Sequence, residues 1–166
     1  MVDRYKQKVN SSETSTVDDG NSNLYKLSSF VYFYNIKFLK GKDVEVVSNY
    51  LKEKSDKFFF KNAFIDFKNN SFTSKDTNIL LHKGVFDKER NSEDKTNTFS
   101  NKNDPRIFGV SSKGNKKKIV LNKAIFTSCK KNDSCPPWSI KANKITHDRQ
   151  KKEISYKDAI LNFYDV

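Results

Sequence analysis

The chain has 166 residues, 35% of them hydrophobic, which is enough for one domain with one modest core. No apolar run approaches the roughly 20 residues of a membrane-spanning helix, and the charged start is not followed by the apolar stretch of a signal peptide. The formal net charge of +12 fits nucleic acid, an anionic membrane or a phosphorylated lipid as partner. It equally fits a genome that places Lys at exposed positions. Only four of the 32 basic residues are Arg, and Arg is the residue that proteins favour for contacts to nucleic-acid bases.

The first 23 residues are polar and show no hydrophobic period, which predicts a flexible tail before a domain covering residues 24–166. A strict alternation begins near Ser28. One parity carries Phe30, Tyr32, Tyr34, Ile36 and Phe38. This period of two predicts one long strand from Ser28 to Leu39 with those side chains on one face. Residues 40–43 are predicted to form a turn, followed by a strand over 44–47, although Val44, Val47 and Leu51 would also fit one face of a helix.

The rest of the chain has the pattern of short strands separated by polar turns. The predicted strands cover 57–60, 63–67, 72–77, 79–82, 119–121, 124–128, 139–142, 144–147, 153–156 and 159–164. Two polar segments, 87–105 and 111–118, are predicted to be loops. Many short strands with almost no helical pattern predict an all-β fold.

Three segments share one order: an apolar residue, two polar residues, Ala, two apolar residues and a polar residue. They begin at Phe60, Leu121 and Tyr156. The two polar residues suit a corner, and Ala suits a crowded inward position just after it. Stacked strand–corner–strand units of this kind predict a pile of bent strands. The unequal spacing of the segments, 61 and then 35 residues, also fits chance similarity among strands rich in Lys and Asn.

Catalytic and metal sites have no visible support. Two cysteines and two histidines would fill a tetrahedral zinc site, but His82 and His147 are 65 residues apart, unlike the close pairs of zinc fingers. No Gly-rich turn accompanies Cys129, and no paired carboxylates lie in an apolar setting. The sequence therefore predicts a protein that is not an enzyme and that uses no metal or cofactor.

The segment from Phe126 to Ile140 is the most distinctive. Cys129 and Cys135 flank a polar turn, and two prolines then precede Trp138, the only Trp of the chain. A Cys129–Cys135 disulfide would close a short loop and stabilise the fold by about 2 kcal/mol. The alternatives are two free thiols or pairing with cysteines elsewhere.

This segment resembles the LptD (OstA) family of lipopolysaccharide-assembly outer-membrane proteins. The resemblance lies in Thr127-Ser128-Cys129, Trp138-Ser139, Ile145-Thr146-His147-Asp148 and the Asp158-Ala159 strand that leads to Phe163-Tyr164-Asp165-Val166. Upstream, Ser55–Phe60, Lys75–Thr77 and Asn103–Ser112 are also similar. The resemblance covers about residues 24–166.

The resemblance implies an open β-jellyroll on the periplasmic side of the outer membrane of a Gram-negative bacterium. Its trough would pass lipopolysaccharide acyl chains from the periplasmic bridge protein LptA to the outer-membrane barrel of the same protein, which works with the lipoprotein LptE. We expect the chain to be a fragment or excised domain, because it ends where the family enters its barrel. Cys129 matches the family cysteine that pairs with the barrel's C-terminal region, and Cys135 is an alternative local partner.

Alternation along the strands and the resemblance together predict the residues that line the trough. They are Phe30, Tyr32, Tyr34, Ile36, Phe38, Ala63, Ile65, Phe67, Ala124, Phe126, Trp138, Ile140, Ala159, Leu161 and Phe163. By resemblance, the strand at Ser28–Leu39 is the bare edge that docks to LptA by strand addition.

Two other functions are compatible with this composition. A basic nucleic-acid-binding module of the OB type would carry its aromatic residues on a convex, Lys-rimmed sheet. An adhesin-like structural domain would have a closed core and no trough.

Overall fold

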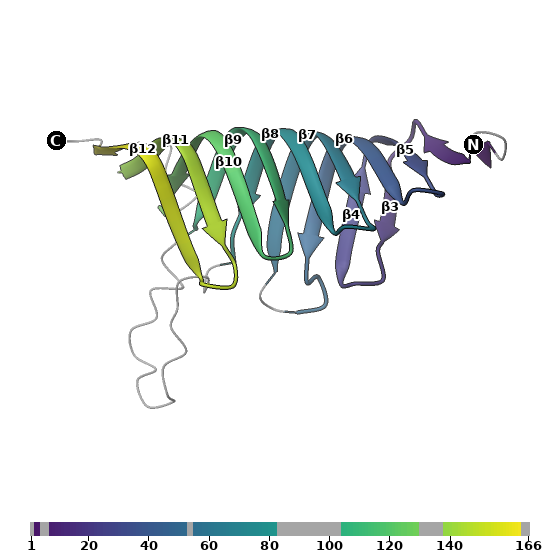
Figure 1. The fold of residues 1–166 in the computed structure, drawn as a ribbon, viewed down its shortest axis with the longest axis horizontal. Helices are drawn as coiled ribbons and strands as arrows, with labels where there is room; N and C mark the ends of the chain where they lie inside the picture. Colours follow the sequence, from purple (N-terminus) through teal and green to yellow (C-terminus); the bar gives the residue numbers. More distant parts are fainter. Residues whose placement is uncertain (1, 4–6, 53–54, 83–103, 130–137, 164–166) are drawn as a thin grey trace, which may run out of the picture.

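The computed structural model describes residues 2–3, 7–52, 55–82, 104–129 and 138–163, and all regular structure in these ranges is β-strand. The strands form one antiparallel sheet of twelve. They are β1 (Val2–Asp3), β2 (Lys8–Ser11), β3 (Ser15–Asp18), β4 (Asn23–Leu27), β5 (Ser29–Phe33), β6 (Phe38–Ser48), β7 (Asp56–Asp66), β8 (Ser71–Leu80), β9 (Arg106–Asn115), β10 (Lys118–Thr127), β11 (Trp138–Asp148) and β12 (Glu153–Phe163). Figure 1 shows them stacked along one axis, with the N-terminal strands at one end and β12 at the other. The described ranges hold no helix with the length and apolarity needed to cross a membrane.

Each strand from β6 to β12 bends once at a corner, where one residue per strand has no partner in the pairing register. These corner residues form a row across the sheet: Asp43, Lys61, Asp76, Val110, Lys123, Asn143 and Asp158. Every second member, beginning with Asp43 at φ 46° and ending with Asp158 at φ 53°, has left-handed backbone geometry. Because the unpaired residues of neighbouring strands face one another, the ladder is interrupted at the same level in every strand, and the sheet folds along this row.

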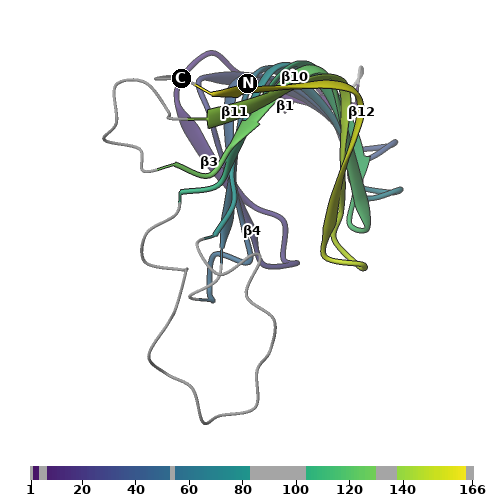
Figure 2. The same cartoon turned by 90° about the vertical axis from the view of Figure 1, so that its left-hand side faces the viewer.

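The corner row divides the sheet into two walls, which Figure 2 shows as the two arms of an open arch. Wall A comprises residues 44–48, 56–60, 77–80, 106–109, 124–127, 138–142 and 159–163. Wall B comprises residues 38–42, 62–66, 71–75, 111–115, 118–122, 144–148 and 153–157. The two walls enclose the hydrophobic core, and the side opposite the corner row is open.

At the N-terminal end each wall continues on separate short strands. β4 pairs with the wall A half of β6, and β5 pairs with the wall B half. Ser28, between them, donates its N–H to the Lys42 carbonyl beside the corner (3.2 Å). β3 then extends wall A by pairing with β4, and β2 extends wall B by pairing with β5.

The corner explains the three similar segments of the sequence. Because it inserts one residue, the inward positions on either side of it are three apart instead of two. Phe60 and Ala63 on β7, and Leu121 and Ala124 on β10, are such inward pairs, at most 4% exposed. The β7 segment runs opposite to the other two, so Ala63 lies in the row of Leu121 and Ala124 in the row of Phe60. The order of apolar and polar residues in these segments is nearly the same when read forwards or backwards from the corner. The same order can therefore form a corner in a strand of either direction.

The all-β prediction, with stacked bent strands in an open sheet, is confirmed. Neighbouring pairs of predicted short strands, such as 57–60 with 63–67 and 153–156 with 159–164, prove to be the two halves of single bent strands. The predicted loop at 111–118 is wrong, because residues 111–115 belong to β9. The predicted loop at 87–105 falls mostly outside the described residues.

The prediction of one strand from Ser28 to Leu39 is wrong. β5 ends at Phe33, and a turn with Lys37 at φ 52° leads into β6. The predicted turn at 40–43 is also wrong, since these residues lie within β6. Gly41 is needed there for packing, because a Cβ at this position would lie 2.7 Å from Leu27 Cδ2.

The prediction of a flexible tail over residues 1–23 also differs from the structure, which has β2 and β3 paired into the sheet. These two strands contain few apolar residues, so their sequences show no hydrophobic alternation that would predict a strand. β5 is therefore not a bare edge, because β2 and β6 flank it. The edge predicted at Ser28–Leu39 lies farther out, at β1, β2 and β3.

Candidate functional site

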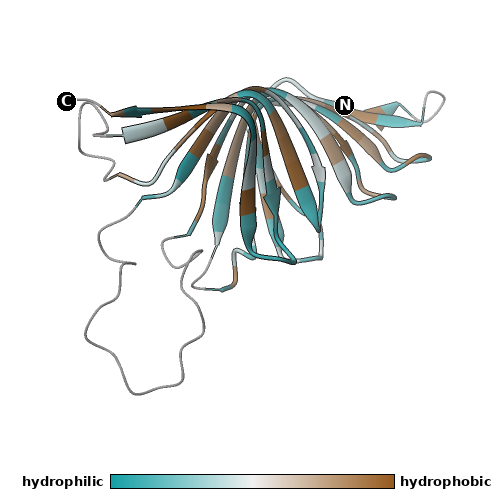
Figure 3. Ribbon diagram, turned by 60° about the vertical axis from the view of Figure 1, so that its left-hand side comes forward, coloured by the Kyte–Doolittle hydropathy of each residue, from teal (hydrophilic) through white to brown (hydrophobic). Residues whose placement is uncertain are grey.

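The two walls enclose a cavity of about 690 Å³ that opens between their free ends. Its apolar lining comes from both walls: Tyr25, Val46, Phe58, Phe60, Ile65, Phe67, Phe72 and Ile119. Figure 3 shows hydrophobic segments recurring on neighbouring strands of the stack. A cavity of this size and polarity is typical of sites for apolar or amphipathic ligands.

Aromatic rings from four strands and one turn shape the cavity. Phe67, in the turn after β7, makes edge-to-face contacts with Tyr25 (5.6 Å between centroids) and Tyr32 (6.0 Å). The Phe60 and Phe72 rings lie 5.2 Å apart. Burial, followed by the charge of nearby Asp19, raises the pKa of Tyr25, so its hydroxyl stays neutral. The lining is thus broad and apolar, with a polar group at one edge.

A buried carboxylate lies at the mouth of the cavity. Asp56, at the start of β7 in wall A, accepts hydrogen bonds from the backbone N–H of His82 (3.0 Å) and from Arg149 Nη2 (2.7 Å). His82 Nδ1 lies 2.8 Å from the same carboxylate. Burial raises the pKa of Asp56, but these bonds and the charge of Arg149 outweigh it and hold the pKa below its usual value. Asp56 is therefore ionised at neutral pH.

His147 also lines the cavity and is 4% exposed. Its Nδ1 is buried with no hydrogen-bond partner among the described residues. Burial is the main cause that lowers the pKa of His147, and the charges of Arg149 and His82 lower it further against the opposite effect of Asp56. The ring is therefore neutral at pH 7 and contributes to an apolar interior.

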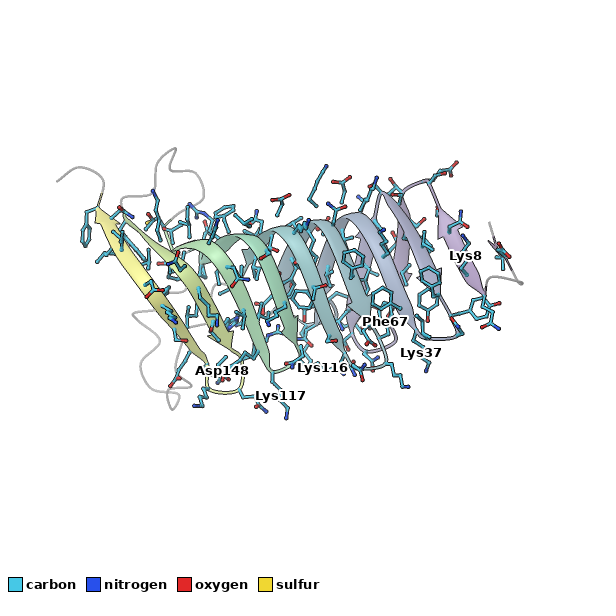
Figure 4. All side chains as sticks on the ribbon, turned by 45° about the horizontal axis from the view of Figure 1, so that its top comes forward. Lys8, Lys37, Phe67, Lys116, Lys117 and Asp148 are labelled. Atoms are coloured by element: carbon cyan, nitrogen blue, oxygen red, sulfur yellow. The ribbon has the colours of Figure 1, made fainter. Side chains whose placement is uncertain are left out.

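The turns at the free end of wall B are basic. We call these turns rim B: residues 34–37, 67–70, 116–117 and 149–152. Rim B carries Lys37, Lys68, Lys116, Lys117, Arg149, Lys151 and Lys152. Figure 4 shows Lys37, Lys116 and Lys117 along one edge of the molecule, with Asp148 on the same edge near Lys117. The described part of the opposite rim includes the acidic residues Asp18, Asp19 and Asp56.

The structure places most of the predicted lining residues in the interior. Buried core residues are Ala63, Ile65, Ala124 and Phe126, with Phe30, Tyr32, Phe67, Trp138 and Ile140 packed against the core. Ala159, Leu161 and Phe163 pair with Ala142, Ile140 and Trp138 in register, so they share the inner face. They are exposed because β12 ends the described stack.

Three predicted lining residues lie elsewhere. Tyr34 and Ile36 are in the turn between β5 and β6, 40% and 55% exposed. Phe38 contacts Phe64 on the convex face, with 6.3 Å between ring centroids. The turn shifts the alternation by one residue, so that Leu39 points inward in its place and is 1% exposed.

The charged cluster at the mouth was not predicted from the sequence. Asp56, His82 and Arg149 are separated by 26 and 67 residues, and no local motif connects them. The sequence offers His82 and His147 as metal ligands or as partners of a cysteine nucleophile, whereas the structure places both in the lining of this cavity. In the described part of the chain, no three His, Cys, Asp or Glu side chains are grouped to hold a metal ion.

Cys129 is buried, has no disulfide partner among the described residues, and its Sγ lies 3.9 Å from the Trp138 carbonyl oxygen. Its carbonyl oxygen accepts a hydrogen bond from Arg106 Nη1 (2.6 Å). Cys135 lies outside the described residues, so the pairing of Cys129 stays a prediction.

No family model matches the chain, and no curated protein sequence matches it. Among solved structures, the chain is similar to LptH, the LptA homologous periplasmic component of the lipopolysaccharide transport device of Pseudomonas aeruginosa. The identity is 13%, the similarity covers 99% of both chains and the TM-score is 0.45. A similarity at this level carries no conclusion about function.

Proposed function

We propose that the chain binds the acyl chains of lipopolysaccharide between its two walls and passes them along the stack, as a non-enzymatic part of lipopolysaccharide transport. The observation that carries this proposal is the apolar cavity of about 690 Å³, open on the side opposite the corner row. Each methylene group moved from water into such a lining contributes about 0.8 kcal/mol. The walls would hold acyl chains while the head group stays at the open side.

The distribution of aromatic residues supports a lipid over a nucleic acid. Tyr25, Phe58, Phe60 and Phe126 belong to the buried core, and further rings pack against it from inside. Stacking on bases needs accessible ring faces. Phe64 and Phe108 are exposed on the convex face, but Phe64 is covered in part by Lys40, whose Nζ lies 5.6 Å from the ring centroid. The open side also argues against an adhesin-like closed core.

The ends of the stack suggest the partners. β12 pairs with β11 alone in the described residues and has Ile160 66% exposed, which suits continuation by further chain or by a partner strand. We propose that this end meets the outer-membrane barrel and LptE. At the opposite end, β1, β2 and β3 would receive LptA by strand addition. These partners and a periplasmic position at the outer membrane follow from the family resemblance.

Site-specific photo-cross-linking tests the proposal with matched neighbours. Ile65 is 6% exposed and lines the cavity, whereas Phe64, the preceding residue, is 37% exposed on the convex face. A photoreactive phenylalanine analogue in place of Ile65 is expected to cross-link to lipopolysaccharide, and the same analogue in place of Phe64 is not. Ile140 and Lys141 give a second pair in wall A. Equal cross-linking from both members of each pair would refute binding between the walls.

A further inference from the structure

One ion pair joins the free ends of the two walls across the mouth of the cavity. Arg149 lies in the turn between β11 and β12, on rim B, and Asp56 begins β7 in wall A. The two residues are 93 positions apart in the chain, and Arg149 Nη2 donates to Asp56 Oδ2 at 2.7 Å. Both residues line the cavity, so the contact lies where a ligand held between the walls would place its head group.

The guanidinium is held in place by contacts other than Asp56. The Arg149 N–H donates to the Lys117 carbonyl in the neighbouring turn (2.8 Å), which fixes the backbone. The Arg149 Cζ lies 5.8 Å from the centroid of the Phe58 ring, in cation–π geometry. Arg149 is 24% exposed at its side chain, and its hydrogen bond to Asp56 uses Nη2. An arginine side chain has five N–H donors, so further donors are available to a ligand.

Asp56 is a buried and firmly held carboxylate. Its side chain is 6% exposed, and His82 binds it through both the backbone N–H and Nδ1. Guanidinium binds carboxylate and phosphate with the same planar geometry. The Asp56 carboxylate therefore binds the Arg149 guanidinium in the way that an anionic group of a ligand would. Lys116 and Lys152 line the same cavity and add positive charge near the turn.

We propose that Arg149 binds the phosphate group of an amphiphile whose acyl chains lie in the cavity, and that Asp56 is the internal anion that the ligand displaces. This inference rests on the proposed function, because the acyl chains must occupy the apolar lining. Exchange of one anion for another keeps Arg149 paired while the two rims separate. A ligand without phosphate leaves the ion pair in place.

Binding measurements on charge variants test this inference. The variants are Asp56→Asn and Arg149→Gln, and the matched controls are Asp43→Asn and Lys61→Gln, which break an exposed ion pair of the same length (2.7 Å) at the corner row. The probes are a bisphosphorylated acylated disaccharide, the same amphiphile without its phosphates, and inorganic phosphate. Thermal unfolding of each variant checks the fold. Arg149→Gln keeps the test available if Asp56→Asn fails to fold, because Arg149 lies on a turn.

Asp56→Asn is expected to tighten binding of the phosphorylated amphiphile about ten-fold, since it removes a competing charged partner. Arg149→Gln is expected to weaken that binding about ten-fold. Binding of the amphiphile without phosphates should be unchanged in both variants, and the two controls should resemble the wild type.

Three results would overturn the inference. If both amphiphiles bind and neither variant separates them, the inference fails while acyl-chain binding stands. If inorganic phosphate alone binds Asp56→Asn as tightly as the phosphorylated amphiphile does, the site takes free phosphate and not a lipid head group. If neither amphiphile binds the wild type, the proposed function fails together with this inference.

Discussion

Replacing Gly41 with Ala tests the packing at the corner of the sheet. A Cβ at position 41 would lie 2.7 Å from Leu27 Cδ2 and 2.8 Å from Val44 Cγ2, well inside the roughly 3.5–4.0 Å of favourable carbon contacts. Leu27 and Val44 are at most 1% exposed, so neither has room to move aside. Overpacking of this kind costs about 1–3 kcal/mol. Ala also restricts the unfolded chain, which returns about 0.4–1 kcal/mol.

The expected net result is a loss of about 1–2 kcal/mol in the free energy of unfolding. For a chain of this length, that corresponds to a decrease in Tm of about 2–8 °C. Urea denaturation measures the loss as a lower midpoint at unchanged m-value. An unchanged or higher midpoint would refute the reasoning, because it would show that position 41 has room for a methyl group.

A double-mutant cycle with Leu27→Ala separates overpacking from a general sensitivity of this region. Removing the Leu27 side chain frees the space that the new methyl group needs. The double variant should therefore be more stable than the sum of the single losses predicts, by at least about 0.5 kcal/mol. If the losses in free energy of unfolding are additive, the Leu27 side chain is not what clashes with a methyl group at position 41.

Three other predictions concern the interior, the corner and the end of the stack. The pKa of His147 is lower in the folded state than in the unfolded state, so the unfolded state binds a proton more readily. The contribution of His147 to stability should therefore be fully present above about pH 6.5 and be lost as the pH falls below it. His147→Leu should weaken this dependence in thermal unfolding measured from pH 7.5 to 5. Lys123→Val should lower the free energy of unfolding by about 1–2 kcal/mol because position 123 has φ 47°, whereas Lys61→Val, at a corner position without left-handed φ, should leave the urea midpoint nearly unchanged. Ile160→Lys should reduce self-association of the isolated chain in sedimentation velocity, because it places a charge on the outer strand β12; an unchanged sedimentation profile in an associating wild type would rule out this edge as the contact.

Local alternation in the sequence was enough to predict the class of fold and much of the inner face. Ala63, Ile65 and Phe67 follow a period of two, and each proves to be buried or packed against the core. The order of an apolar residue, two polar residues and Ala predicted corners because a corner changes inward spacing from two to three. On other strands the same inward pair is hidden: on β8 it is Ser74 and Thr77, which are buried and joined by a hydrogen bond of 2.9 Å. Polar inward residues carry no hydrophobic signal, so those corners could not be predicted.

The strand boundaries near Phe33 and the cluster at the mouth depended on the tertiary structure. The alternation from Phe30 to Phe38 continues through the turn that ends β5, so hydrophobicity alone gave no sign of it. Asp56 and Arg149 meet only because the strands from β7 to β11 stack in register and the corner row folds the sheet. Each strand can be predicted from its own residues, because side-chain alternation is a local property of the backbone. Contacts across the two walls depend on the register and bend of every strand between them, and these are set by packing of the whole stack.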